Sequence, residues 1–242
     1  MNPAWSLTAR GSWPDPVVLR SGWSKARARP FNDDVPDAAL RLERGSAAFL
    51  RRCAGWLLDR APAVFSGPLH SDSRRPWIVA GFRPDRSLAL MERDLGLPIP
   101  APAPGVRPGK AEEWARAADL DRVAFEPEWR IGRAGLAEAA AATSTSRFLV
   151  SADDDRLFGY AIVGVGFQIG YLQRVAVDPS VRGSGHGRSL VRASMAWARQ
   201  RGARTMLLNT QLDNHGAAAL YRSEGFEELP ERLTIMRTEE HR

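Results

Sequence analysis

The stretch 181-VRGSGHGRSL-190 places Gly183, Gly185 and Gly187 between two arginines and leads directly into a helical pattern. Glycines leave the main-chain amides of a loop open to an anion, and the amino-terminal end of a following helix adds partial positive charge. The loop follows the apolar run 170-GYLQRVAV-177 and the turn Asp178-Pro179. A strand, a turn, a glycine loop and a helix in this order predict an anion site over residues 182–188.

Two common phosphate-binding motifs do not fit this loop. A Walker loop ends in Gly-Lys-Ser/Thr, but the two lysines of the chain, Lys25 and Lys110, lie far from the loop in the sequence. The dinucleotide fingerprint G-x-G-x-x-G fails because the third glycine, Gly187, comes one residue early. The loop therefore needs another interpretation.

The loop Arg182–Gly187 matches the pattern [QR]-x-x-G-x-[GA], and a second motif follows about 25 residues later. The second motif has the form N-x-x-A-x-x-L-Y-x-x-x-G-F, with its fixed positions at Asn214, Ala217, Leu220, Tyr221, Gly225 and Phe226. Together, in this order, they resemble the GNAT acetyltransferase superfamily over about residues 107–242. The resemblance implies an α/β fold with a mixed, mostly antiparallel sheet flanked by helices.

The resemblance also implies acetyl-CoA as co-substrate, with no metal. Two strands would splay apart to admit the pantetheine arm, and main-chain groups of the loop would bind the pyrophosphate. The donor-site residues implied in this way are Val175, Ala176, Val177, Arg182, Gly183, Ser184, Gly185, His186, Gly187, Arg188, Asn209 and Asn214. Asn214 is also a predicted helix N-cap. We interpret His186 as a loop residue or a phosphate donor, not as a base.

Tyr221 occupies the general-acid position of the resembled family. A tyrosine stays protonated at neutral pH and can donate to a departing thiolate with a pKa of about 8.5. Glu126 and Glu128, in 123-VAFEPEWR-130, are candidates for the base or for contacts with a cationic acceptor. The alternative for these two acids is an ordinary solvated loop. The implied reaction is direct acetyl transfer to a primary amine of unknown identity.

A proline-rich segment divides the chain. We expect an N-terminal α+β region over residues 1–97, a linker over 98–109 and the catalytic domain over 110–242. Residues 78–94 resemble residues 223–239, and in this alignment Trp77 stands where Tyr221 stands. The N-terminal region is therefore either a degenerate GNAT-like copy without the glycine loop or an unrelated cap.

Local patterns predict most of the elements. Residues 37–59 predict one long helix, and 147–165 predict a hairpin around an acidic turn. Further helices are expected within 112–129, 135–143, 188–202 and 214–225, and strands at 170–177, 205–211 and 233–238.

Composition restricts the function classes. The net charge of +6 comes from scattered arginines with acids among them, which disfavours a nucleic-acid partner. The absence of a long apolar run and of a signal pattern favours a cytoplasmic protein without a membrane partner, and the single cysteine, Cys53, excludes an internal disulfide. The resembled superfamily often forms homodimers. The alternative function is a non-catalytic acyl-CoA sensor acting through the tryptophan-rich N-terminal region, although Tyr221 and Asn214 favour catalysis.

Overall fold

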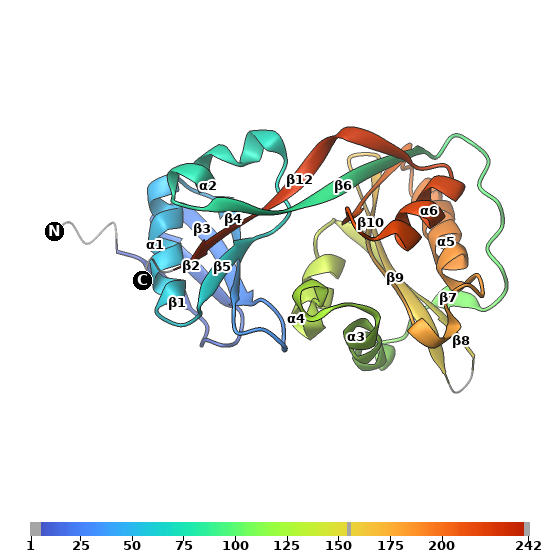
Figure 1. Cartoon of the computed structure of the whole chain (residues 1–242), viewed down its shortest axis with the longest axis horizontal. Coiled ribbons are helices and arrows are strands. Elements are labelled where there is room, and N and C mark those ends of the chain that lie inside the picture. Colours follow the sequence, from blue (N-terminus) through green and yellow to red (C-terminus); the bar gives the residue numbers. More distant parts are fainter. Residues whose placement is uncertain (1–5, 154–155, 240–242) are drawn as a thin grey trace. The chain divides into compact units, whose positions relative to one another are not determined.

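The computed structural model describes residues 6–153 and 156–239. The chain forms two compact units. The N-terminal unit contains the described residues up to Leu88 and from Glu231 onward, and the C-terminal unit contains Ala89–Pro230. Both units combine a sheet with helices, so the predicted α/β class is confirmed (Figure 1).

The N-terminal unit begins with an antiparallel meander. Its strands are β1 (Thr8–Arg10), β2 (Val17–Ser21), β3 (Ser24–Pro30) and β4 (Ala38–Arg44). Helix α1 (Ala47–Leu58) then returns the chain so that β5 (Ala63–Ser66) pairs parallel to β4, as a crossover requires. A 3-10 turn, η2 (Ser71–Ser73), and helix α2 (Arg75–Val79) follow. The core of this unit includes Leu19, Leu40, Phe49, Leu50 and Leu57, all fully buried.

The long helix predicted over residues 37–59 is wrong in its first part, because residues 38–44 form β4. Ala38 and Leu40 are buried and alternate with less buried neighbours, which is the period of a strand. Gly45, with φ of +147°, breaks the chain direction, and the Ser46 hydroxyl accepts a hydrogen bond from the Phe49 amide and starts α1. The helical prediction is confirmed only from Ala47 onward.

The part of the sheet that belongs to the C-terminal unit has the strand order β6-β11-β10-β9-β8-β7. Its strands are β6 (Arg83–Asp94, which begins in the N-terminal unit), β7 (Val106–Pro108), β8 (Thr145–Ala152), β9 (Leu157–Gly166), β10 (Ile169–Val177) and β11 (Thr205–Gln211). Strands β7 to β10 pair antiparallel, and β11 pairs parallel to β10. The mixed, mostly antiparallel sheet is therefore as predicted.

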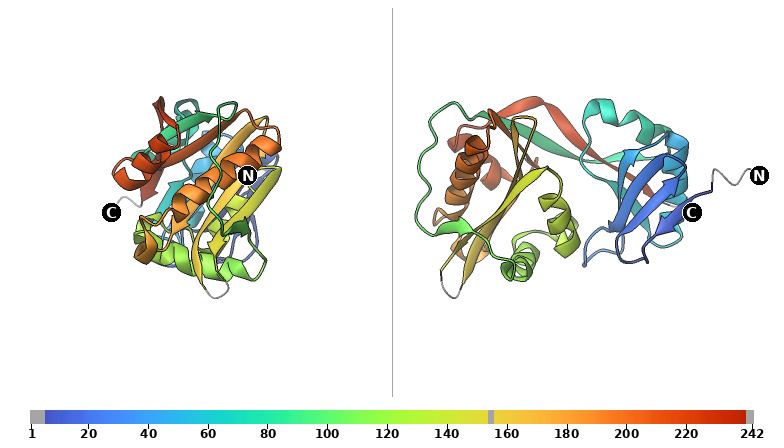
Figure 2. Two further views of the ribbon diagram at one scale, coloured as in Figure 1. Left: turned by 90° about the vertical axis from the view of Figure 1, so that its right-hand side faces the viewer. Right: turned by 180° about the vertical axis from the view of Figure 1, so that it is seen from behind.

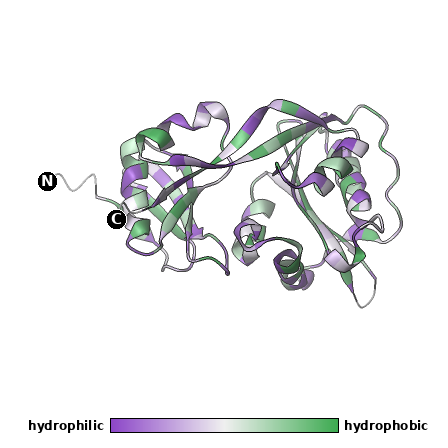
Figure 3. Cartoon of the chain, in the orientation of Figure 1, coloured by the Kyte–Doolittle hydropathy of each residue, from purple (hydrophilic) through white to green (hydrophobic). Residues whose placement is uncertain are grey.

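Helices cover both faces of this sheet (Figure 2, right). They are α3 (Glu113–Ala124), α4 (Gly132–Ala140), α5 (His186–Gln200) and α6 (His215–Ser223), with 3-10 turns η3 (Pro127–Trp129) and η4 (Pro179–Val181). Helix α5 is amphipathic (Figure 3). It buries Leu190, Val191 and Met195 against β9 and β10. Helices α3 and α4 pack on the opposite face. Both faces of β9 are thereby covered, which explains its continuous apolar run.

The two units share one order of elements. In each unit an antiparallel set of strands leads to a helix, a parallel strand, a short helix and a long final strand. The C-terminal unit adds α3 and α4 between β7 and β8. The remaining elements of the two units therefore follow one another in the same order.

The final strands pass from one unit to the other. Strand β6 leaves the N-terminal unit at Leu88 and becomes the neighbour of β11 in the C-terminal unit. Strand β12 (Glu227–Glu239) leaves the C-terminal unit at Pro230, and its residues 237–239 pair with β5. Each sheet is therefore completed by a strand that follows the short helix of the other copy.

The proline-rich segment lies within the C-terminal unit, so the unit boundary differs from the expected one. Arg93 donates to the Pro98 carbonyl at 2.7 Å, and Arg192 of α5 donates to the Ala101 carbonyl at 3.4 Å. The Ala103 amide donates to the Ser189 hydroxyl at 3.3 Å. Prolines have no N–H to donate but keep their carbonyls, so side chains of β6 and α5 can fix this segment in place.

Over the described ranges 6–153 and 156–239, no helix has the length and apolarity needed to cross a lipid bilayer.

Candidate functional site

The predicted anion loop lies between η4 and α5. Gly183 and Gly185 have φ of +85° and +89°, and open space surrounds the position that a Cβ atom would occupy at each. Gly185 caps α5 without any side-chain hydrogen bond to the helix. The amides of His186, Gly187 and Arg188 belong to the first turn of α5, where no carbonyl of the same helix can accept from them. The amides at the start of α5 are therefore without a hydrogen-bond partner in their own helix, which is the arrangement that an anion site requires.

Strands β10 and β11 part beside this loop. Their parallel pairing covers Ile169–Leu172 and Thr205–Leu208, and a bulge follows in β10 between Leu172 and Arg174. Val175–Val177 continue beyond the paired part, and Asn209 is the first residue of β11 beyond it. A polar main chain is thus available between two diverging strands, which is where the resemblance places the pantetheine arm.

The ring of His186 is fixed against the sheet. Its Nδ1 atom forms a hydrogen bond with the Ser151 hydroxyl of β8 at 2.9 Å, and the ring stacks on Phe158 of β9 with centroids 4.7 Å apart. These contacts anchor the first residue of α5 while the two preceding residues stay exposed. The structure thus shows His186 as an anchored residue at the junction of the loop and α5.

Asn214 caps α6 as predicted. Its Oδ1 atom accepts from the Ala217 amide at 3.1 Å, and its Nδ2 atom donates to Gln211 of β11 at 3.0 Å. The cap fixes the start of the helix that carries Tyr221. At the other end, Gly225 adopts a left-handed φ of +81° and ends the helix.

Tyr221 lies in the core of the C-terminal unit, 8% exposed, with its ring edge-on to Phe226. Burial raises the pKa of its hydroxyl to about 12, and the positive charge of Arg174 opposes that rise. The side chain is therefore a neutral proton donor throughout the physiological pH range.

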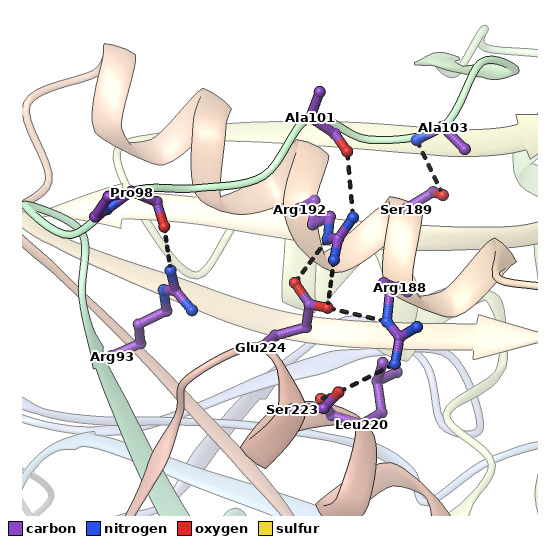
Figure 4. A network of polar contacts seen from close by, with 10 residues as sticks. All are labelled: Arg93, Pro98, Ala101, Ala103, Arg188, Ser189, Arg192, Leu220, Ser223 and Glu224. Carbon is purple, nitrogen blue, oxygen red and sulfur yellow. Dashed lines mark hydrogen bonds and ion pairs between the residues drawn. The ribbon is translucent and has the colours of Figure 1, made fainter.

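Ion pairs lock α5 to α6 behind the loop (Figure 4). The Glu224 carboxylate, 2% exposed, accepts from Arg192 at 2.8 and 3.0 Å and pairs with the Nε atom of Arg188 at 3.0 Å. Arg188 also donates to the Ser223 hydroxyl at 3.2 Å. A buried carboxylate held by two guanidinium groups fixes the helix after the glycine loop relative to the helix of Tyr221.

Glu126 and Glu128 lie in the connection between α3 and α4, and both are exposed. The connection is attached to the donor side through Arg174 of β10, whose Nη2 atom donates to the Trp129 carbonyl at 2.9 Å. The charge of Arg174 also acts on the Tyr221 hydroxyl.

Sequence reasoning missed a buried polar network around Arg174. Its guanidinium pairs with the Asp121 carboxylate at 2.7 and 2.9 Å and stacks on Phe125 at 3.6 Å. The Tyr160 hydroxyl donates to the same carboxylate at 2.5 Å, and burial raises the pKa of that hydroxyl well above its ordinary value. A charged arginine in the mostly apolar strand GYLQRVAV is a signal that could have indicated it.

The N-terminal unit has no comparable loop before its helix α1. A Cβ atom on Gly45 would come within 2.7 Å of the Phe49 ring, and Ser46 already caps the helix. The start of α1 is therefore filled by its own side chains. Among the described residues of both units, no group of three or more His, Cys, Asp or Glu side chains could hold a metal ion.

An exposed glycine loop at a helix start, two diverging parallel strands and a buried tyrosine on the next helix thus occur together in the C-terminal unit. The model of the acetyltransferase (GNAT) family matches residues 110–226, and the chain belongs to this family.

Named relatives agree with this assignment. The chain is 30% identical to an aminoglycoside N(6')-acetyltransferase type 1 of Stenotrophomonas maltophilia, over 57% of this chain and 94% of that protein. It is 33% identical to a mycothiol acetyltransferase of Thermobispora bispora, over 62% of this chain and 57% of that protein, so it spans little more than half of that relative.

A solved structure resembles almost the whole chain. It is a tandem GNAT protein from the clavulanic acid biosynthesis pathway, with a TM-score of 0.60 and 17% identity, over 99% of this chain and 84% of that chain. At this identity the likeness concerns the fold, and it includes both units.

Proposed function

We propose that the protein transfers an acetyl group from acetyl-CoA directly to a primary amine. The observation that carries the proposal is the open loop Gly183–Gly187 at the start of α5, beside the point where β10 and β11 part. Two left-handed glycines and the amides of a first helical turn suit a diphosphate better than a neutral ligand.

The loop, strand β10 and Tyr221 have separate roles in this reaction. The main chain of residues 182–188 holds the diphosphate, and the main chain of Val175–Val177 aligns the arm and polarises the thioester carbonyl. Acetyl-CoA supplies the activated acetyl group. The amine forms the new C–N bond and the C–S bond breaks. Tyr221 gives its proton to the departing sulfur and regains one, through water, from the nitrogen of the new amide.

The acceptor side is formed by the connection between α3 and α4. Glu126 and Glu128 favour a cationic amine, which loses its proton to one of these carboxylates or to water before attack. A relative acetylates aminoglycosides according to its name, which supports an amine acceptor of this charge. We place the reaction in the cytoplasm, where the lone, buried Cys53 stays reduced.

The test follows the release of free thiol from acetyl-CoA with a panel of amines: aminoglycosides, polyamines, amino sugars and peptides with free N-termini. Wild type and Tyr221→Phe are measured side by side, and the shift in melting temperature with acetyl-CoA is recorded for both. Turnover that falls in the variant while the thermal shift remains supports the proposal.

Two other outcomes separate the alternatives. A thermal shift without turnover across the panel would favour the acyl-CoA sensor. No thermal shift with acetyl-CoA would contradict the assignment of the glycine loop itself.

A further inference from the structure

The last residues of α3 and the connection from α3 to α4, residues 122–131 together, are here called the acceptor segment. Its main chain is held from outside by two arginines that belong to the donor side. Arg182, the first residue of the glycine loop, donates from Nη2 to the Ala124 carbonyl at 2.8 Å. Arg174, which precedes Val175–Val177, donates to the Trp129 carbonyl at 2.9 Å. The two donor-binding stretches are therefore each tied to the acceptor segment.

The two hydrogen bonds, from Arg174 and from Arg182, differ in how firmly their donor side chains are held. Arg174 is 13% exposed and pairs with Asp121, which is 1% exposed and also caps the Ile131 amide at 3.1 Å. This tie is part of the core and stays in place. Arg182 is exposed, and it follows directly on η4 and precedes the left-handed Gly183. The position of its side chain therefore depends on how firmly the loop is held.

Binding of a diphosphate would hold the loop. An anion that engages the amides of residues 185–188 restrains the loop main chain from which the Arg182 side chain extends. Ala124 is the last residue of α3. Carbonyls at this end have no hydrogen-bond partner within the helix and interact favourably with a cationic donor. A fixed guanidinium at this carbonyl restrains the start of the acceptor segment, and Arg174 restrains its end.

We propose that Arg182 is a positioning residue that transmits occupancy of the diphosphate loop to the acceptor segment, with Arg174 as the fixed support. This inference rests on the proposed function and deepens it, because it makes ordering of the acceptor side depend on the donor. The coupling runs through a side chain, whereas the anion is held by the main chain, so the two can be separated by mutation.

The experiment measures amide hydrogen exchange of the full chain with and without saturating coenzyme A. In wild type, peptides that cover residues 122–131 should exchange at least about threefold more slowly when coenzyme A is bound. In Arg182→Ala this added protection should disappear, while the peptides of the glycine loop remain protected. Arg182→Lys should restore part of it, because an ammonium group can also donate to the Ala124 carbonyl.

Arg199→Ala is the matched control, because it removes an exposed arginine from the last turn of α5 in the same unit. It should leave both protection patterns unchanged. The inference would be overturned if coenzyme A still protected the acceptor segment in Arg182→Ala. It would also be overturned if coenzyme A protected the loop peptides of wild type but not its acceptor segment. Failure of coenzyme A to protect even the loop peptides would contradict the proposed function instead.

Kinetics with whichever amine the panel identifies give a second readout. Arg182→Ala should raise the KM of the amine by more than the KM of acetyl-CoA. Equal effects on the two constants would point to a loss of donor binding alone and would contradict the coupling.

Discussion

Trp77 and Tyr221 occupy equivalent turns in the two units. The Trp77 carbonyl accepts from the Phe82 amide at 3.0 Å, and the Tyr221 carbonyl accepts from the Phe226 amide at the same distance. Each ring also meets its phenylalanine edge-on, and Gly81 and Gly225 both have left-handed φ. The weak similarity between residues 78–94 and 223–239 thus corresponds to one helix–turn–strand motif present twice, with a phenol in one copy and an indole in the other.

A tyrosine in place of Trp77 should not create a second active site in the N-terminal unit. We expect Trp77→Tyr in a Tyr221→Phe background to show no more acetyl transfer than Tyr221→Phe alone, because α1 begins at a filled turn without an open glycine loop. Thiol release with the identified amine measures this. Recovery of turnover in the double variant would mean that the N-terminal unit binds the donor.

Removal of the proposed general acid should affect turnover and leave donor binding intact. Tyr221→Phe should lower kcat by roughly 10²- to 10⁴-fold with little change in the KM of acetyl-CoA. Because burial raises the pKa of Tyr221 to about 12, the hydroxyl stays protonated well above pH 9. The wild-type profile of kcat against pH should therefore show no alkaline limb caused by Tyr221 below about pH 11. A limb near pH 9 to 10 that disappears in the variant would contradict this assignment.

The left-handed conformation of Gly185 should be essential to the anion loop. Gly185→Ala has room for its methyl group, so its cost is backbone strain of about 1–2 kcal/mol. Relief of that strain turns the loop amides, and we expect the affinity for coenzyme A to fall by about tenfold, measured by calorimetry. Gly216→Ala is the control: this glycine lies in α6 with open space and no left-handed φ, and the change should leave affinity unchanged. An unchanged affinity in Gly185→Ala would remove this loop from donor binding.

Acid stability should depend on Glu113. Its side chain is 6% exposed and accepts from Arg107 at 2.8 and 2.9 Å, and this hydrogen bonding lowers its pKa to about 2. A pKa depressed below the unfolded value stabilises the fold fully above about pH 4.5, and this contribution is lost as the pH falls toward 2.

Glu113→Gln should therefore be less stable by about 2 kcal/mol at pH 7, with a smaller further loss between pH 4.5 and 2 than wild type. Urea unfolding at several pH values measures both. The exposed neighbour variant Glu112→Gln serves as control. Parallel pH curves for Glu113→Gln and wild type would show that the pair does not contribute as described.

The sequence predicted those parts of the site that depend on local spacing. The glycine loop, the Asn214 cap and the Tyr221 position are all set by residues within a few positions of one another, so their motifs can be found by inspection. The Asp121–Arg174 pair could not be found in this way, because it joins residues 53 positions apart on different elements. The strand Ala38–Arg44 was mistaken for helix because alanine and leucine suit both, and its partners β3 and β5 decide the outcome.

Because β6 and β12 each have residues in both units, the two halves of the gene depend on each other as the two halves of the fold do. A gene fragment that encodes residues 98–242 alone would specify the glycine loop and Tyr221 but not β6, the strand beside β11. It would also specify residues 231–239 without β5, with which they pair in the intact chain. Neither half contains all the strands with which its part of the sheet pairs in the intact chain, so neither can be transferred alone as a finished module.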